Sequence, residues 1–240
     1  AGTVLPSTTP NALYGTLAPQ PDRKDDLRKY RYGKGNFQLH YVLDGDVTWN
    51  TPGLEKVQLL HLTPGLDGVS KARNEAERGM LPEVPTICVG QPCAADPTRA
   101  PEGKTVLWLQ MPEAPRHVKG DAAGRIDVPA DGQWTEALRE AYADRIEAIL
   151  ASHIDGFRDK VLKRRAISPA DLEGYNANLV GGDPYGGACT LDQFFLFRPF
   201  TDTKRHDTCI KGLYHIGAST HPGPGLSGGS GFLVAKELGA

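Results

Sequence analysis

The stretch that decides the fold is glycine-rich and reads Lys211-Gly-Leu-Tyr-His-Ile-Gly-Ala-Ser-Thr-His-Pro-Gly-Pro-Gly-Leu-Ser-Gly-Gly-Ser-Gly-Phe-Leu-Val-Ala-Lys-Glu-Leu238. Leu213–Ile216 predicts a short strand, residues 217–228 predict a loop, and a helix is predicted from about Gly229. Strand, glycine loop and helix N-terminus in this order present backbone N–H groups and a partial positive charge to an electron-rich ligand. The stretch therefore predicts a ligand-binding loop, with a structural turn capped by glycines as the alternative.

Two catalytic motifs match this stretch in letters only. Gly223-Pro-Gly-Leu-Ser-Gly228 spells G-x-G-x-x-G, but the chain ends at residue 240, too soon for the acidic residue that the dinucleotide fingerprint needs about 20 positions later. Gly225-Leu-Ser-Gly-Gly229 spells the nucleophile elbow of serine hydrolases, yet no strand feeds directly into Ser227. Neither motif is predicted to function as such.

Composition excludes several classes of protein. The chain has 240 residues, a net charge of −2 and 23% charged residues, which is typical of a globular protein of one large or two small domains and not of a nucleic-acid binder. No apolar run reaches the roughly 18 residues that span a bilayer. Four scattered cysteines at positions 88, 93, 189 and 209 are interpreted as thiols in a reducing cytoplasm, and no metal site is predicted.

Hydrophobic periodicity predicts the main elements. Alternation predicts a strand over residues 37–43, and further strands are predicted over residues 57–62, 86–90 and 105–111. A helix is predicted over residues 68–80, and a long amphipathic helix from about residue 131 to 165. The basic residues at its end, Lys160, Lys163, Arg164 and Arg165, are interpreted as complementing the helix dipole, with an anion-binding site as the alternative. Ser168 is predicted to cap a further helix, with Pro169 in its first turn. Strands first and helices later favour an α+β domain joined to a piece of another fold.

Several blocks of sequence together resemble one enzyme family. These blocks are residues 168–183, Asp192-Gln193, Leu196-Phe-Arg-Pro199 and residues 213–223, together with Arg31-Tyr-Gly33, Trp49, Gly90-Gln-Pro92 and residues 96–103. They resemble the C-terminal half of phytoene dehydrogenase-related, carotenoid desaturase-like FAD-dependent oxidoreductases. The resemblance covers nearly the whole chain.

The resemblance implies a fold that combines α+β and α/β parts. Residues 1–17 would be the end of an internal segment of the FAD domain, and residues 18–206 a substrate domain with a mixed, mostly antiparallel sheet and helices. Residues 207–240 would supply the closing strand, loop and helix of a Rossmann-like FAD-binding domain. The pyrophosphate-binding loop of such a domain is absent from this chain. Together with the start at Ala1, this leads us to expect a fragment or one part of a cut or two-chain enzyme.

The resemblance also implies site residues. Near FAD it places two runs of the glycine loop, which are Gly217, Ala218, Ser219 and Thr220, and then Gly225, Leu226, Ser227 and Gly228. His221 and Tyr185 are weak candidates for catalysis, because a loop histidine before proline is as often a scaffold and Tyr185 is expected only to line a cavity. Flavin chemistry requires no protein nucleophile, which fits the lack of a triad.

We therefore expect the C-terminal part of an FAD-dependent dehydrogenase or desaturase that acts on a largely apolar small molecule. Such a chain would be inactive until it joins the missing N-terminal half. The alternative is a non-catalytic domain that binds a ligand or a partner. No nucleic acid is expected as a partner, the expected location is the cytoplasm, and membrane association and oligomer formation stay open.

Overall fold

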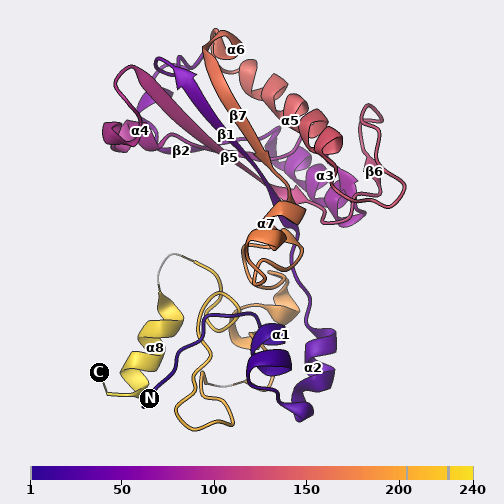
Figure 1. Ribbon diagram of the computed structural model, residues 1–240, viewed down its shortest axis with the longest axis vertical. Helices are drawn as coiled ribbons and strands as arrows, with labels where there is room; N and C mark the ends of the chain where they lie inside the picture. Colours follow the sequence, from indigo (N-terminus) through magenta and orange to yellow (C-terminus); the bar gives the residue numbers. More distant parts are fainter. Residues whose placement is uncertain (1, 204, 226–227, 240) are drawn as a thin grey trace. The chain divides into compact units, whose positions relative to one another are not determined.

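The computed structural model describes residues 2–203, 205–225 and 228–239, and it divides into two compact units. Unit 1 comprises residues 1–33 and 175–240, and unit 2 comprises residues 34–174 (Figure 1). The predicted domains 1–17, 18–206 and 207–240 were assigned by their roles around FAD. The two units have other boundaries, and the assignment of roles stays a prediction.

Unit 2 is built on a five-stranded sheet with the strand order β2-β4-β5-β1-β7. Its strands are β1 (Gly35–Asp44), β2 (Leu59–Leu62), β4 (Ile87–Gly90), β5 (Lys104–Ala114) and β7 (Val161–Ile167). Every neighbouring pair in this sheet is antiparallel. The small parallel pair β3 (Met80–Leu81) and β6 (Gly120–Asp121) lies apart from it. The predicted α+β class with a mostly antiparallel sheet is confirmed.

Side-chain alternation along β1 and β5 separates a buried face of the sheet from an open one. Phe37, Leu39, Tyr41 and Leu43 of β1 are buried, and the intervening residues are more exposed. The helix α5 (Glu136–Ala151) packs against the buried face, with Phe37 and Tyr142 in edge-to-face contact at 5.1 Å between ring centroids. Complete burial of such a side chain is worth about 1.5–3 kcal/mol, so this layer is the core of unit 2.

The other helices of unit 2 are α3 (Gly65–Glu77), α4 (Pro92–Ala95) and α6 (Phe157–Lys160), and α7 (Pro169–Tyr175) ends at the boundary with unit 1. The helix predicted over residues 68–80 is confirmed as α3. The predicted cap of α7 is confirmed too, because the Asp171 N–H donates to Ser168 Oγ at 3.2 Å and the Ser168 N–H donates to Asp171 Oδ2 at 2.7 Å.

The long helix predicted from residue 131 to 165 is wrong at both ends. The helix begins at Glu136 after the Thr135 cap, and Ser152 caps its end. Gly156 then adopts a left-handed conformation with φ of 60°. Residues 161–167 form β7 and pair with β1, so the predicted basic helix end is an edge strand. Pairing along a free sheet edge satisfies the backbone of this segment, and that gain overrides the helical spacing of its apolar residues.

Unit 1 contains little regular structure besides α1 (Pro10–Ala12), α2 (Lys24–Lys29) and α8 (Gly229–Glu237). A small core forms where Leu13, Tyr14, Tyr30 and Phe200 meet. The predicted helix from Gly229 is confirmed as α8. The strand predicted over Leu213–Ile216 is present only as isolated bridges from Leu213 to Val4 and from Tyr214 to Asp207. Leu213–Ile216 runs parallel to the N-terminal segment. Two backbone hydrogen bonds join the described residues of the two segments, and a third joins Val4 to the adjacent Gly212, too few for a regular strand.

Candidate functional site

The glycine loop, residues 217–228, begins in unit 1 directly after the paired segment and leads into α8. Gly217 has φ of 96°, and a Cβ there would lie 2.3 Å from Ser7 Oγ, so the position requires glycine. The Gly217 N–H donates to Ser230 Oγ in the first turn of α8 at 2.9 Å. This bond holds the start of the loop against the helix N-terminus.

Arg198 is the centre of the site and is fully buried, with 0% exposure. Its guanidinium donates to five backbone carbonyls, which belong to Tyr185, Gly187, Ala188, Gln193 and Ala218. A planar guanidinium with five N–H donors is the side chain suited to bind several carbonyls at once. Arg198 therefore joins the glycine loop, through Ala218, to the segments around residues 185–188 and 193.

Asp183 organises the same region from the opposite side. Its carboxylate accepts hydrogen bonds from the backbone N–H groups of Gly33, Tyr185 and Gly187 at 2.7–2.9 Å. Burial raises the pKa of Asp183, and the three donors oppose that shift. A Cβ on Gly33 would lie 3.1 Å from the carboxylate, so glycine permits this close approach.

Several of the blocks of sequence that carried the family resemblance meet around these two residues in unit 1. Gln193 binds Arg31 twice, because its Oε1 accepts from the Arg31 N–H at 2.9 Å and its Nε2 donates to the Arg31 carbonyl at 2.6 Å. Ser219 Oγ and Tyr30 OH both donate to the Gly186 carbonyl, at 2.7 Å and 2.6 Å. We call Arg198, Asp183, Gln193, Tyr30 and Ser219 the Arg198 network. Pattern reasoning placed Asp183, Gln193 and Arg198 in motifs but assigned them no role. An arginine inside the apolar run Leu196-Phe-Arg-Pro199 was the available signal.

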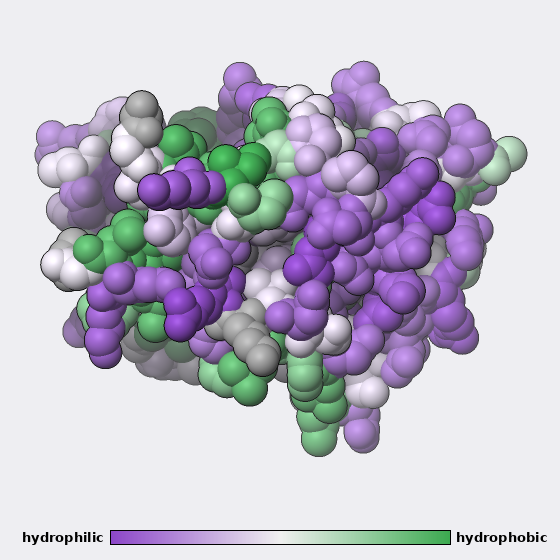
Figure 2. Space-filling view, turned by 90° about the horizontal axis from the view of Figure 1, so that it is seen from below, coloured by the Kyte–Doolittle hydropathy of each residue, from purple (hydrophilic) through white to green (hydrophobic). Residues whose placement is uncertain are grey.

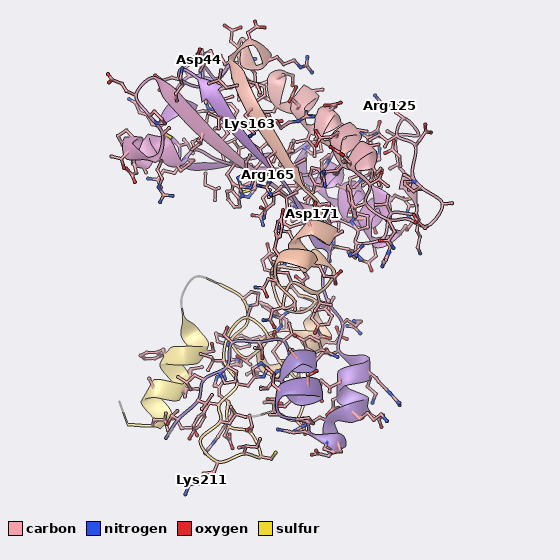
Figure 3. The ribbon with its side chains drawn as sticks, viewed as in Figure 1. Asp44, Arg125, Lys163, Arg165, Asp171 and Lys211 are labelled. Atoms are coloured by element: carbon pink, nitrogen blue, oxygen red, sulfur yellow. The ribbon has the colours of Figure 1, made fainter. Side chains whose placement is uncertain are left out.

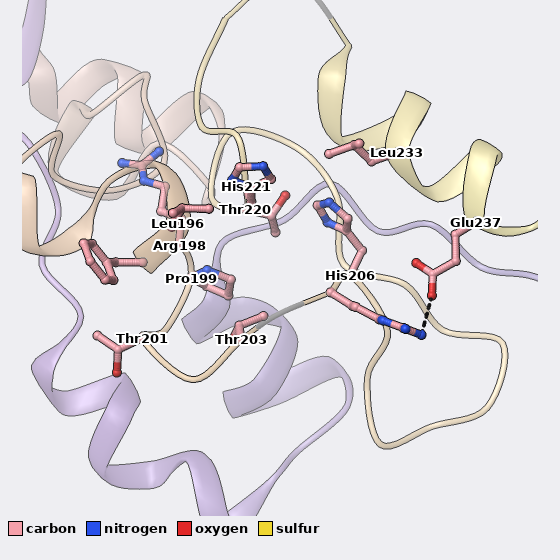
Figure 4. Close-up of a pocket in the computed structure, with 12 residues that line it drawn as sticks. Leu196, Arg198, Pro199, Thr201, Thr203, His206, Thr220, His221, Leu233 and Glu237 are labelled. Atoms are coloured by element: carbon pink, nitrogen blue, oxygen red, sulfur yellow. Dashed lines mark hydrogen bonds and ion pairs between the residues drawn. The ribbon is translucent and has the colours of Figure 1, made fainter.

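A cavity of about 560 Å³ opens beside the network (Figure 4). Arg198, Pro199, Thr220 and His221 line it, and Leu233 and Glu237 of α8 line its other side. Glu237 pairs with Arg205 at 3.3 Å at this edge. The volume of the cavity lies within the range of about 300–1,000 Å³ that is typical of small-molecule sites. The cavity therefore joins two predicted residues, Thr220 and His221, to the motif residues Arg198 and Pro199.

The glycine loop also carries backbone donors for which the described residues supply no acceptor. Over the described residues, the N–H groups of Ala218 and Ser219 donate to no acceptor, although Ser219 is only 3% exposed. Gly225 is exposed, and Gly228 precedes α8 with φ of 62°. Leu226 and Ser227 lie outside the described residues. The donor set of the loop fits a ligand rich in acceptors, and the predicted role of all eight residues at FAD stays a prediction.

The two weak catalytic candidates occupy different surroundings. His221 Nδ1 lies 3.1 Å from the Phe195 carbonyl, and its ring packs edge-on against Phe195 at 4.7 Å between centroids. Tyr185 is half-exposed, and it contributes its backbone carbonyl to Arg198 but no surface to the cavity. His221 alone of the two lines the cavity, where its ring is oriented by Phe195.

A buried histidine, His215, holds the segment that precedes the glycine loop. His215, with 1% exposure, has Nε2 2.8 Å from the Thr8 carbonyl and Nδ1 3.2 Å from Tyr14 OH. These partners fit a neutral ring that donates from Nε2 and accepts at Nδ1. Burial lowers the pKa of His215 to about 4. His215 therefore stays uncharged at neutral pH and holds the segment before Gly217 on the N-terminal residues.

Exposed apolar side chains are frequent in unit 1. They include Phe195, Leu196 and Phe197 beside the cavity and Phe232 on α8. Figure 2 shows hydrophobic side chains gathered toward the left of a face that is otherwise mainly hydrophilic. Gathered apolar surface of this kind is typical of an interaction site.

Other kinds of site were searched for within the described part of the chain. It contains no group of three or more His, Cys, Asp or Glu side chains that could hold a metal ion. All four cysteines are free thiols. None of the helices in the described ranges combines the length and the apolar character that crossing a membrane requires.

Comparisons with known proteins give the family. No family model matches the chain. The chain is 32% identical over 168 residues to the pyridine nucleotide-disulfide oxidoreductase domain-containing protein 2 of Mus musculus. This alignment covers 70% of the chain and 27% of the relative. It is 31% identical over 196 residues to a 4,4'-diapophytoene desaturase of Staphylococcus aureus (strain Newman), covering 81% of this chain and 35% of the relative.

A solved structure, an oxidoreductase from Methanosarcina mazei, aligns with all of this chain and 43% of its own at 14% identity, with a TM-score of 0.44. At that score the likeness does not by itself establish a shared fold. The chain thus spans about a quarter to a third of the length of the curated relatives. The relatives confirm the resemblance that the motifs predicted, and the chain is homologous to phytoene desaturase-related oxidoreductases.

Proposed function

We propose that this chain forms part of an FAD-dependent oxidoreductase of the dehydrogenase or desaturase type, which acts on a largely apolar small molecule. The homologues support dehydrogenase-type chemistry in general. We propose in addition that the enzyme uses FAD, that its substrate is apolar and that a further part of the protein is needed. These three points rest on one observation. The motif residues meet around the buried Arg198, which holds the glycine loop and its backbone N–H donors beside a cavity.

The residues present fit the flavin portion of FAD. Ala218 and Ser219 offer backbone N–H groups without acceptors, and α8 begins with the partial positive charge of its N-terminus beside the same loop. When bound, the flavin ring supplies hydride transfer, and the protein supplies position and electrostatics. The loop would donate hydrogen bonds to the ring edge and favour the negative charge of its reduced form.

The Arg198 network would keep those donors in place. Because Arg198 binds the Ala218 carbonyl and the Ala188 carbonyl at once, the peptide that joins Ala218 to Ser219 is oriented before any ligand arrives. Fixed donors of this kind stabilise developing charge without the cost of reorganisation. The exposed Phe195, Leu196 and Phe197 would then be covered by the remaining part of the enzyme.

The test is co-purification of flavin. The chain is co-expressed with the coding sequence that precedes it in the genome, and the purified complex is scanned for visible flavin absorption. The proposal predicts one flavin per complex, and none on the 240-residue chain alone, because the phosphates and adenosine of FAD need a site that these residues do not supply. A colourless complex would instead favour a domain that binds a ligand or partner without catalysis.

A further inference from the structure

One face of the unit 2 sheet is covered by α5, and the opposite face is open. On that open face β1 presents Gln38, His40 and Val42, the alternating partners of its buried residues. The strands β5 and β7 flank β1 and bring Trp108 and Arg165 opposite His40, and Val106 and Lys163 opposite Val42. Apolar and cationic side chains therefore share the centre of this face.

A groove of about 410 Å³ follows these residues. Its apolar lining comes from Val42, Pro92, Val106, Leu107 and Trp108. Small-molecule sites are mostly apolar, contain a few placed polar groups and have volumes of about 300–1,000 Å³. The groove matches that description and is built from unit 2 alone.

A motif that the proposed flavin site does not use shapes this groove. Gly90 lies against the ring of Trp108, and a Cβ on Gly90 would come within 2.9 Å of that ring. Gln91 fixes the turn that follows, since its Oε1 accepts from Trp49 Nε1 at 2.8 Å and its Nε2 donates to the Leu54 and Val57 carbonyls. Pro92 then lines the groove. The Gly90-Gln-Pro92 block thus lets Trp108 lie flat and closes one side of the site.

The nitrogen-bearing side chains that line the groove include His40, Lys163 and Arg165, and no lining residue is acidic. Tyr41 lines it too, but its OH donates to Glu147 Oε2 at 3.2 Å. Asp44, the carboxylate farther along this face of β1, is already paired with Lys104 at 2.5 Å. Figure 3 shows Lys163 and Arg165 along β7. Lys163 has no ion-pair partner among the described residues, so its charge is available to a ligand.

We propose that this groove binds a single-chain anionic amphiphile, a hydrocarbon chain that ends in a carboxylate. The chain would lie along Val42, Val106 and Trp108, and the carboxylate would meet Lys163, with the positive charge of Arg165 beside it on the same face. A carboxylate paired with a lysine at the side of an apolar groove forms charge-assisted hydrogen bonds. As a statement about the enzyme's substrate this rests on the proposed function, but the binding site does not.

The test uses the purified 240-residue chain and decanoate, followed by calorimetry and by tryptophan fluorescence, so that no flavin is involved. Decanoate is expected to bind, and Trp108→Phe to remove the fluorescence change. Lys163→Glu should weaken decanoate binding at least about tenfold, since one charge-assisted hydrogen bond is worth that factor. Lys163→Arg should bind nearly as the wild type does. Lys211→Glu makes the same charge change at an exposed site in unit 1 and should have no effect.

Each other result overturns the proposal. Equal decanoate binding by Lys163→Glu and the wild type would show that Lys163 does not form a cationic end of the site. Equal binding of 1-decanol would show that the carboxylate is not recognised. Binding to anionic phospholipid vesicles without binding of monomeric decanoate would assign the face to a membrane surface. Flavin co-purification is independent of all these outcomes, so the two proposals fail separately.

Discussion

Arg198 shows how a single side chain can organise a site without touching a ligand's reactive atoms. It is fully buried, and its charge is satisfied mainly by backbone carbonyls, with the carboxylate of Asp183 close enough to interact electrostatically. Burying such a charge is favourable only when nearly all of its donors have partners. The arrangement is therefore sensitive to any change in the shape of the donor group, even one that keeps the charge.

Arg198→Lys should destabilise unit 1 by at least about 3 kcal/mol, because the ammonium group cannot reach all five carbonyls and several are left buried without donors. Urea unfolding, followed by the fluorescence of a label on unit 1, measures the change. Arg28→Lys is the matched control, since Arg28 is an exposed arginine in the same unit. An unchanged midpoint in Arg198→Lys would show that the network does not hold the unit together.

The burial of His215 leads us to expect that the folded chain loses stability in acid. Its pKa is about 4 in the folded chain and about 6.5 when unfolded, so the unfolded state binds more protons between these values. Its contribution is thus complete above pH 6.5 and is lost as the pH falls toward 4. Unfolding free energies at pH 7 and pH 4 should differ by about 3 kcal/mol more in the wild type than in His215→Gln. Parallel pH profiles of the two proteins would contradict this.

At the residue scale, the sequence identified the right positions without their functions. Asp183, Gln193 and Arg198 stood in recognisable motifs, but their partners are backbone groups. Some of these partners are more than a hundred residues away, such as Arg31 for Gln193 and Gly33 for Asp183, whereas those of Arg198 lie within 20 residues. Backbone partners leave no trace in residue type. The glycine at position 217 was predictable for the opposite reason, because a left-handed conformation selects its residue locally.

The strand β7 is the element where local pattern and final structure disagree. Its residues alternate between the two faces of the sheet, so that Arg164 lies toward α5 and Lys163 toward the open face. Arg164 bridges to Glu140, Asp144 and Glu147 of α5 at 2.7–2.9 Å. These ion pairs raise the pKa of Arg164 despite the opposing effect of burial. The apolar residues of this segment have helical spacing, so the sequence alone does not indicate that its side chains face two sides of a sheet. The pairing that decides this is made with β1, more than a hundred residues earlier.

Arg164→Met should destabilise unit 2 by about 2 kcal/mol, since Glu147, which also accepts from Tyr41 OH, would lose its Arg164 partner in a half-buried setting. Lys163→Met is the matched control, one residue away on the same strand but on the open face. Thermal unfolding of both variants measures the difference. Equal losses would mean that the two sides of β7 are not distinguished as the structure requires.

Elements with strong local signals were predicted correctly. The strand β1 has an apolar residue at every second position, and α7 begins with a serine cap followed by proline, both of which act within a few residues. The strand predicted over Leu213–Ile216 is only a pair of bridges, because its neighbour is the short segment at Val4 and offers few hydrogen bonds.

At the scale of the whole molecule, the chain combines two units with different proposed tasks. Unit 1 carries the Arg198 network and the glycine loop, and unit 2 carries the open sheet face. The alignments cover 27% to 35% of the length of these two relatives. Under the proposed function, backbone donors of the glycine loop would contact one side of the flavin, and another part of the enzyme would supply the rest of its site.

The most direct test compares the flavin content of the co-expressed complex between two variants, in each of which one alanine is replaced by aspartate. Ala218→Asp places a carboxylate on the glycine loop, and Ala123→Asp makes the same change on an equally half-buried residue of unit 2. Urea unfolding first confirms that both variants fold. The account predicts that Ala218→Asp loses most of its flavin, because the new charge repels an electron-rich ligand, while Ala123→Asp retains it. Equal flavin in both complexes would contradict the claim that residues 217–220 contact the cofactor.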